Sequence, residues 1–255
     1  MDLGLTDKRV LITGGTRGIG RATALMYAAE GARVAITYNK SADEAEKLVE
    51  ELGGTGRALA VQYDLRDPDS IDSAVTAVNE ALGGVDVLVA NALWFTFGDP
   101  GEDDPFEDLD AEKWTRRFRA NTEGHMRTVQ RVLKGMRTNG WGRIVLLSSI
   151  TAHYGMWRSE IYSSSKAALH GFAKGLMWEQ HGVLANVVAP GATKTEFFDQ
   201  LLADPDMREM VDKEIERTPS GRISEPEDVA RLILFLGSAA NGNINGEIIN
   251  VAGGR

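Results

Sequence analysis

The chain lacks several kinds of residue, and each absence excludes a class of chemistry. It contains no cysteine, so disulfide bonds and catalysis by a thiolate are excluded. Basic residues number 28 against 37 acidic ones, and the net charge of -9 disfavours nonspecific binding to nucleic acid. Histidines are also few and do not have the spacing of metal ligands, so we expect no metal site; they are His125, His153, His170 and His181.

Long apolar runs are missing as well. No such run follows a basic N-terminal segment, so the sequence indicates neither a signal peptide nor a membrane span and favours a cytoplasmic protein. Its 255 residues, of which 43% are hydrophobic, are enough to bury the core of one large domain, which we place at 1–255.

The apolar residues fall into seven short runs that alternate with helical patterns. This alternation is typical of βαβ units and predicts an α/β fold with a seven-stranded parallel sheet. Ser41-x-x-Glu44, Asp67-Pro68 and Glu225-Pro226 indicate helix starts, the first as a candidate capping box. The runs are Val10–Thr13, Arg33–Tyr38, Ala58–Gln62, Val85–Ala90, Arg143–Ser148, Val183–Ala189 and Glu247–Val251.

A glycine-rich turn follows the first run. The segment Thr13-Gly-Gly-Thr-Arg-Gly-Ile-Gly20 leads into a helical pattern and includes Thr16, Arg17 and Ile19. Gly14 can adopt a backbone conformation closed to other residues, Gly18 allows a pyrophosphate to approach the main chain, and Gly20 allows the helix to pack closely on the strand. The helix N-terminus would then face the phosphates of a dinucleotide.

The end of the second run indicates which dinucleotide binds. A carboxylate there would bind the ribose hydroxyls and repel a 2′-phosphate, but the residues are Tyr38, Asn39, Lys40 and Ser41. Lys40 and Ser41, with Arg17 from the glycine turn, can hold a phosphate, so we expect NADPH. The alternative is that Lys40 is only a solvated residue at a helix start.

Ser149, Tyr162 and Lys166 have the spacing of a carbonyl-reducing site. Residues four apart share one helix face, so Tyr162 and Lys166 would point together. One cation at ~4 Å and an effective dielectric constant of ~20 contributes about 4 kcal/mol, or roughly three pKa units, and we expect Lys166 to lower the pKa of Tyr162 by that order. Ser149 follows an apolar run and could bring its hydroxyl to a substrate oxygen. The alternative is a packed tyrosine and a solvated lysine.

The glycine turn, Ser149 and Tyr162-x-x-x-Lys166 together resemble the short-chain dehydrogenase/reductase family over nearly the whole chain. The late run Arg217–Val229 and the ending Gly246–Gly254 resemble its branch of 3-oxoacyl-carrier-protein reductases and polyketide ketoreductases. The resemblance implies a single-domain, doubly wound Rossmann fold that assembles as a homotetramer or homodimer through helices near 114–137 and 162–179. It also implies that Tyr162 gives a proton to a carbonyl oxygen while hydride comes from the nicotinamide.

The same resemblance assigns further residues. Asn121 corresponds to the asparagine that holds a water linking Lys166 to solvent, and so completes the catalytic set with Ser149 and Tyr162. Asp64 corresponds to the acid that touches the adenine, and Tyr162 and Lys166 also contact the cofactor. The other cofactor-binding residues implied are Leu65, Asn91, Ala92, Pro190, Gly191, Thr193 and Thr195.

The chain departs from the family around 93–112, where Leu93 replaces the usual glycine. Aromatic residues there, and near 154–157 and in the segment 192–218, are candidates for an apolar substrate pocket, for a cover of the core edge or for an oligomer contact. The candidates are Trp94, Phe95, Phe97, Tyr154, Trp157, Phe197 and Phe198. Seven acidic residues lie between Asp99 and Asp110, where they could form a lid that rejects anionic substrates or a solvated loop; carboxylates bind hard cations, but nothing here fixes a ligand spacing for a metal site. A basic stretch from Lys113 to Arg137 is a solvated face, a subunit contact or a surface for an acidic carrier protein.

We therefore expect an NADPH-dependent ketoreductase that acts on a bulky apolar or polyketide-like carbonyl substrate. The alternatives are a 3-oxoacyl-acyl-carrier-protein reductase of fatty-acid synthesis, with a carrier-protein-bound substrate, and an alcohol dehydrogenase working in the reverse direction. A dinucleotide-sensing protein without catalysis is disfavoured, because the catalytic residues are all present.

Overall fold

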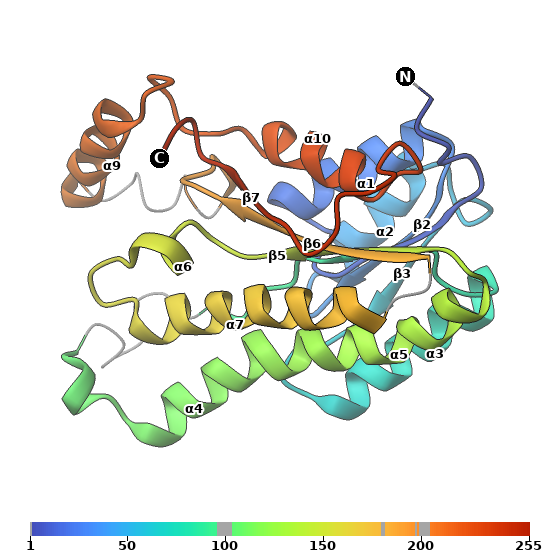
Figure 1. The fold of residues 1–255 in the computed structure, drawn as a ribbon, viewed down its shortest axis with the longest axis horizontal. Coiled ribbons are helices and arrows are strands. Elements are labelled where there is room, and N and C mark those ends of the chain that lie inside the picture. The colour runs from blue at the N-terminus through green and yellow to red at the C-terminus, as the bar shows by residue number, and fades with distance from the viewer. Residues whose placement is uncertain (1, 96–103, 180–181, 197, 199–204) are drawn as a thin grey trace.

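The computed structural model describes residues 2–95, 104–179, 182–196, 198 and 205–255. Seven parallel strands form one sheet in the order β3-β2-β1-β4-β5-β6-β7 (Figure 1). All seven predicted strands are confirmed, with ends that differ by at most two residues. The strands are β1 Arg9–Ile12, β2 Arg33–Tyr38, β3 Ala58–Gln62, β4 Val87–Ala90, β5 Gly142–Leu147, β6 Val183–Pro190 and β7 Ile248–Val251.

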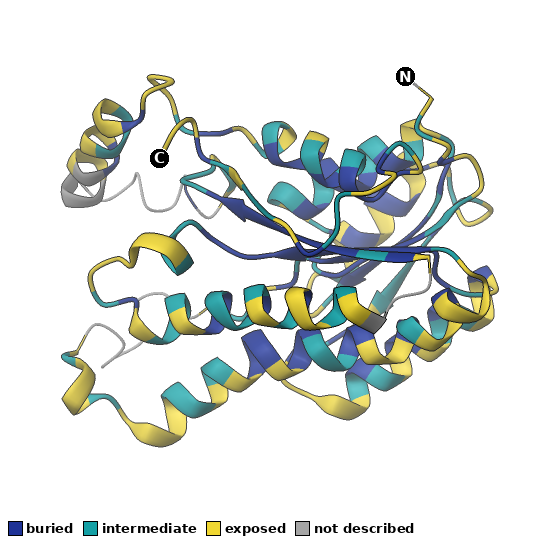
Figure 2. Ribbon diagram, in the orientation of Figure 1, coloured by how far each residue is buried: buried dark blue, intermediate teal, exposed yellow. Residues whose placement is uncertain are grey.

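Helices cover both faces of the sheet, as expected for the doubly wound fold (Figure 1). Alternate side chains of a strand serve opposite faces, so Val10 and Ile12 pack with α1, α2 and α10, whereas Leu11 packs with α3, α5 and α7. Figure 2 shows the strands as a buried layer between the two helical layers. The first layer contains α1 Gly18–Ala29, α2 Ala42–Glu51 and α10 Pro226–Leu236, and the second contains α3 Pro68–Leu82, α5 His125–Thr138 and α7 Glu160–Leu176.

Helices begin at all three of the predicted starts, although one of the predicted caps is not formed. Asp67 caps α3 by accepting a 3.0 Å hydrogen bond from the Asp69 N–H, and Asp228 accepts a 2.9 Å bond from the Glu225 N–H at the start of α10. The capping box predicted at Ser41 is wrong. Helix α2 does begin after this residue, but the backbone of Ser41 is not extended and its side chain makes no capping hydrogen bond.

The strand order places four loops at one edge of the sheet. Strands β1 and β4 are neighbours although their connections run to opposite sides, and the carboxyl ends of parallel strands share one edge. The glycine turn follows β1, Asn91 follows β4, Ser149 follows β5 and Gly191 follows β6. This edge lies toward α6 Thr151–Tyr154 and α9 Pro205–Arg217 (Figure 1).

The remaining elements are short. A 3₁₀ turn spans Phe106–Asp108, α4 spans Ala111–Arg119, a π-helical turn spans Ala120–Gly124, and a second 3₁₀ turn spans Met177–Glu179. Among the described residues, no helix combines the length and the apolar composition that crossing a membrane requires.

Candidate active site

Ser149, Tyr162 and Lys166 lie together at the carboxyl edge of the sheet. Tyr162 and Lys166 are one turn apart on α7, and the Lys166 ammonium nitrogen lies 5.9 Å from the centre of the Tyr162 ring. The Tyr162 hydroxyl shares a hydrogen bond with Ser149. Ser149 and Lys166 are only 9% and 2% exposed. The three residues of the predicted motif therefore form one enclosed polar cluster.

The predicted effect of Lys166 on Tyr162 is wrong in this structure. Lys166 Nζ donates a 2.9 Å hydrogen bond to the carbonyl oxygen of Leu147 instead of to the phenol. Burial raises the pKa of Tyr162, while the hydrogen bond with Ser149 and the charge of Arg117 act in the lowering direction. Burial also lowers the pKa of Lys166 to about 8. The sequence gives the spacing on the helix but not the depth at which the pair is buried.

Asn121 lies in the π-helical turn between α4 and α5, where its side chain is fully used by main-chain partners. Its Nδ2 donates to Trp94 O at 2.8 Å and to Arg117 O at 3.1 Å, and its Oδ1 accepts from Trp94 N at 3.0 Å. Asn121 is 1% exposed. The amide thereby ties the start of the 93–112 loop to the catalytic helix layer, a role that the sequence does not reveal.

The glycine turn has the shape that a dinucleotide requires. Gly14 and Gly18 have φ values of +67° and +52°, in the left-handed region, and a Cβ on Gly20 would lie 2.1 Å from Gly14 O. The Gly18 N–H, at the start of α1, donates a 3.1 Å hydrogen bond to Glu196 Oε2. That carboxylate oxygen stands in for a phosphate oxygen at a helix N-terminus, so the residues fit a dinucleotide.

The other predicted cofactor residues surround this turn. Asn91 Nδ2 donates to Thr13 O at 3.0 Å and Gly14 O at 2.9 Å, so Asn91 holds the turn itself. Asp64 forms an ion pair with Arg66, and its pKa is lowered by Arg66 and also by Asn39. Exposed residues at the ends of α1 and β2 are Arg17, Asn39, Lys40 and Ser41. The remaining predicted cofactor residues lie at the same edge, in its loops or at the adjoining ends of α1, β2 and β6: Thr16, Ile19, Tyr38, Leu65, Ala92, Pro190, Gly191, Thr193 and Thr195.

The aromatic candidates divide into separate groups. Phe95 meets the ring of Tyr162 edge-on, with ring centres 5.9 Å apart and planes at 79°. Trp94 instead packs against the cluster of Tyr63, Leu65, Ile71, Ala74 and Ala92, and Arg66 Cζ lies 5.3 Å from its ring centre. Tyr154 and Trp157 are 69% and 77% exposed, whereas Phe198 is buried. Phe97 and Phe197 lie outside the described residues.

Three residues near the site were not singled out for it from the sequence. Arg117 stands four residues before Asn121, Glu196 follows Thr195, and His125 is fully buried near Lys166, where burial lowers its pKa to about 3 and keeps the imidazole neutral. Helical spacing from Asn121 could have drawn attention to Arg117. Glu196 and Gly18 are 178 residues apart, and no local pattern links them.

Comparison with known proteins gives the family. Residues 8–206 match the family model described as short chain dehydrogenase. A versicolorin reductase from Emericella nidulans is 34% identical over 261 residues, which cover 98% of this chain and 96% of the relative. An L-rhamnose 1-dehydrogenase (NAD(P)(+)) from Sphingomonas sp. is 37% identical over 254 residues, with coverage of 98% and 96%.

A 3-oxoacyl-acyl-carrier-protein reductase from Aquifex aeolicus is 35% identical over 258 residues, with coverage of 100% of this chain and 99% of the relative. These matches extend over nearly the whole length of both partners, and they agree with the seven-stranded parallel sheet. The chain therefore belongs to the short-chain dehydrogenase/reductase family of oxidoreductases, whose members compared above act on carbonyl or hydroxyl groups.

Proposed function

We propose that the protein is an NADPH-dependent ketoreductase that reduces a bulky apolar or polyketide-like carbonyl. The observation that carries the proposal is the position of Tyr162, whose hydroxyl meets Ser149 while its ring meets the edge of Phe95. A proton donor beside an aromatic ring suits the reduction of an apolar ketone. The versicolorin reductase relative supports the same substrate class.

The hydroxyl of Ser149 is prepared to donate a hydrogen bond. Its oxygen accepts bonds from the N–H and the hydroxyl of Thr151, at 3.2 and 3.1 Å, so its own hydrogen is directed elsewhere. NADPH would supply the hydride that is added to the carbonyl carbon. Tyr162 then gives its proton to the carbonyl oxygen, and Ser149 stabilises the charge that develops on that oxygen.

Lys166 and Asn121 complete the proposed proton path. A lysine whose pKa is about 8 exchanges protons near neutral pH, so Lys166 can return a proton to Tyr162 after each turnover. We propose that Asn121 holds a water molecule that links the Lys166 amine to solvent. Its side-chain amide is bonded to Trp94 and Arg117, which leaves the main chain of the π-helical turn to hold that water.

The proposed choice of NADPH depends on Arg17, Lys40 and Ser41. These residues are exposed beside the start of α1 and the end of β2, where no carboxylate repels a 2′-phosphate. Asp64 would face the adenine, and Thr193 and Thr195, which follow β6, would face the nicotinamide half. NADH is the alternative, because the name of the rhamnose dehydrogenase relative includes both dinucleotides.

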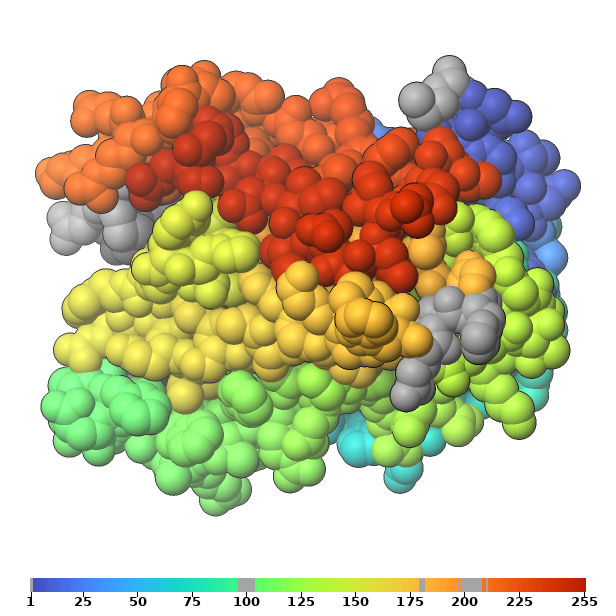
Figure 3. Space-filling view, viewed as in Figure 1, coloured from blue at the N-terminus to red at the C-terminus, as the bar shows by residue number. Residues whose placement is uncertain are grey.

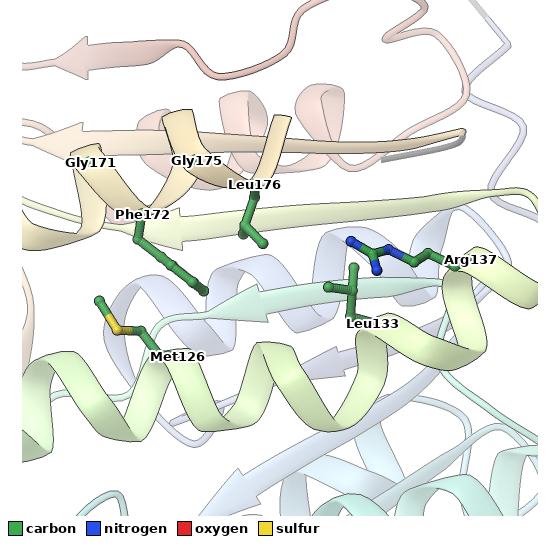
Figure 4. Close-up of a pocket in the computed structure, with 7 residues that line it drawn as sticks. All are labelled: Met126, Leu133, Arg137, Gly171, Phe172, Gly175 and Leu176. Carbon is green, nitrogen blue, oxygen red and sulfur yellow. The ribbon is translucent and has the colours of Figure 1, made fainter. Parts of the chain in front are cut away.

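We propose a homodimer or homotetramer that uses α5 and α7. These helices lie side by side on one face of the molecule (Figure 3), and a groove of about 610 Å³ runs between them (Figure 4). Phe172 and Leu176 of α7 and Met126 of α5 line it. Gly171 and Gly175 also line it, and a Cβ at either would meet nothing within 4 Å, which leaves space for a helix of a second copy.

A substrate panel tests the proposed function. NADPH oxidation is followed with 2-tetralone and other cyclic or aromatic ketones and with acetoacetyl thioesters, and NADP+ reduction is followed with L-rhamnose and with cyclic alcohols. We expect the highest kcat/KM with the bulky ketones. Activity confined to the small thioesters would instead support the second candidate, a 3-oxoacyl-acyl-carrier-protein reductase, which the Aquifex aeolicus relative favours. Preference for L-rhamnose would contradict both.

A further inference from the structure

Three side chains from three segments form a contiguous row at the active site. The guanidinium carbon of Arg117, on α4, lies 4.7 Å from the centre of the Phe95 ring. Phe95, in turn, meets Tyr162 edge-on at 5.9 Å. The carbonyl of Arg117 accepts a hydrogen bond from Asn121, so the main chain that carries this cation is fixed to the catalytic residues.

The row brings a permanent positive charge within electrostatic reach of the phenol. The distances from Arg117 to Phe95, 4.7 Å, and from Phe95 to Tyr162, 5.9 Å, place the guanidinium carbon at most about 11 Å from the centre of the Tyr162 ring. At that distance, and with an effective dielectric constant of ~20, the charge changes the pKa of the phenol by about one unit. Phe95 separates the two groups, so solvent screens this interaction less than it would on an open surface. The charge of Arg117 indeed lowers the pKa of Tyr162, against the larger effect of burial.

The other polar groups around Tyr162 come from different elements. Ser149, after β5, offers a neutral hydroxyl. Lys166, on α7, directs its amine to Leu147 O, and its pKa of about 8 means that it loses its charge as the pH rises above neutrality. His125, on α5, stays neutral because burial lowers its pKa to about 3. Arg117 is therefore the cation of this group that keeps its charge over the whole working pH range.

We infer that Arg117 is a positioning residue for proton transfer, and that its guanidinium, held against Phe95, stabilises the phenolate that Tyr162 becomes when it gives up its proton. The inference rests on the proposed role of Tyr162 as the proton donor. It assigns to α4 a part in the reaction that the catalytic motif on α7 does not supply. It also gives Phe95 a second role: besides lining the proposed substrate pocket, its ring holds the guanidinium of Arg117 near Tyr162.

The test measures the ionisation of Tyr162 directly. The ultraviolet absorbance of the phenolate is titrated in the wild type and in Tyr162→Phe, with and without NADP+, and the difference isolates Tyr162 from the other tyrosines. The same pair is then measured in an Arg117→Met background. We expect the Tyr162 midpoint to rise by about one pH unit when the charge is removed. Arg117→Lys should restore most of that shift.

Two further variants separate the local contact from the net charge. Arg116→Met removes an equal charge from the adjacent position of α4, which is exposed, and should leave the titration midpoint of Tyr162 unchanged. Phe95→Leu keeps the charge but removes the ring on which it rests, and should raise the midpoint by less than Arg117→Met does. An unchanged midpoint in Arg117→Met, or an equal shift in Arg116→Met, would overturn the inference.

Kinetics distinguish this inference from the proposed function. With 2-tetralone, the alkaline limb of kcat/KM should move upward in Arg117→Met by the same interval as the titration midpoint. A higher KM with no movement of that limb would show that Arg117 binds substrate, and the inference would be wrong. If Tyr162→Phe retains full turnover while the titration shifts as expected, the proposed role of Tyr162 fails but the electrostatic contact between Arg117 and Tyr162 stands.

Discussion

The carboxyl edge of the sheet has two halves, the glycine turn proposed to bind the cofactor (the cofactor half) and the surroundings of Tyr162 proposed to bind the substrate (the substrate half), and they are built in different ways. At the cofactor half, main-chain atoms and small residues make the contacts: Asn91 binds the carbonyls of Thr13 and Gly14, and Gly20 packs against Gly14 O. At the substrate half, large side chains that stand on loops make them, as Phe95 does against Tyr162. The cofactor half tolerates few substitutions because main-chain atoms cannot be repacked, whereas the side chains of the substrate half can be substituted one at a time.

This difference predicts that the two halves tolerate substitution unequally. A backbone turn accepts few sequences, so its glycines are set by sterics. The contacts of Phe95 with Arg117 and Tyr162 are made by side chains, which vary at little cost to the fold. Substitutions at the two halves should therefore have different consequences, one for folding and cofactor binding and the other for catalysis.

The largest effect is expected at Tyr162, the proposed catalytic tyrosine. Tyr162→Phe removes the proposed proton donor but keeps the ring beside Phe95, so kcat should fall about 10³-fold while the protein remains folded. Steady-state kinetics with 2-tetralone measure the loss, and quenching of intrinsic fluorescence measures the Kd for NADPH, which should stay within about threefold of the wild type. Turnover near the wild-type level would rule out Tyr162 as the acid.

A pair of glycine substitutions tests the rigidity of the cofactor half. Gly20→Ala would place a Cβ 2.1 Å from Gly14 O, and should lower the free energy of unfolding by at least about 3 kcal/mol. Gly135→Ala, in the exposed part of α5, meets no atom within 4 Å and should raise it by about 0.5–1 kcal/mol. Denaturant unfolding followed by circular dichroism compares the two, and equal effects would contradict the steric reading.

The dinucleotide preference should respond to one charge. Lys40→Ala removes a proposed partner of the 2′-phosphate, so kcat/KM for NADPH should fall about 10- to 100-fold while that for NADH changes little. Lys47→Ala, farther along α2, removes the same charge and serves as the control. Should NADH already exceed NADPH in the wild type, the assignment of Arg17 and Lys40 would be wrong.

The smallest effect is expected where the two halves meet. Glu196 follows β6, and its carboxylate accepts a hydrogen bond from the Gly18 N–H, the position proposed for a phosphate oxygen. Glu196→Gln keeps the size but removes the charge that competes with the phosphate, so the Kd for NADPH should fall about threefold to tenfold. Fluorescence titration measures it. Glu227→Gln, which lines the same small cavity without bonding Gly18, should change the Kd less.

The sequence predicts what short-range spacing determines. The seven strands are predicted from short apolar runs, the glycine turn from its closely spaced glycines, and the alignment of Tyr162 with Lys166 from their four-residue spacing. The structure confirms the strands and brings Ser149, Tyr162 and Lys166 together. The relation between Glu196 and Gly18 depends on packing across the whole sheet, so it left no local pattern. The pKa of Tyr162 is raised, opposite to the prediction, because burial outweighs the hydrogen bond with Ser149 and the charge of Arg117, while Lys166 binds Leu147 O instead of the phenol.

The hydrogen bonds between Asn121 and Trp94 determine what a mutation at position 121 would measure. Its amide bonds both the N–H and the carbonyl of Trp94, in the way that one strand bonds the next, so the residue is a piece of sheet-like pairing carried by a side chain. Asn121→Ala keeps the main chain that is proposed to hold the water, but it removes the hydrogen bonds that fix Trp94, the neighbour of Phe95. A rate loss in this variant would therefore report the release of Trp94 and Phe95 and not the removal of a group in the proton path.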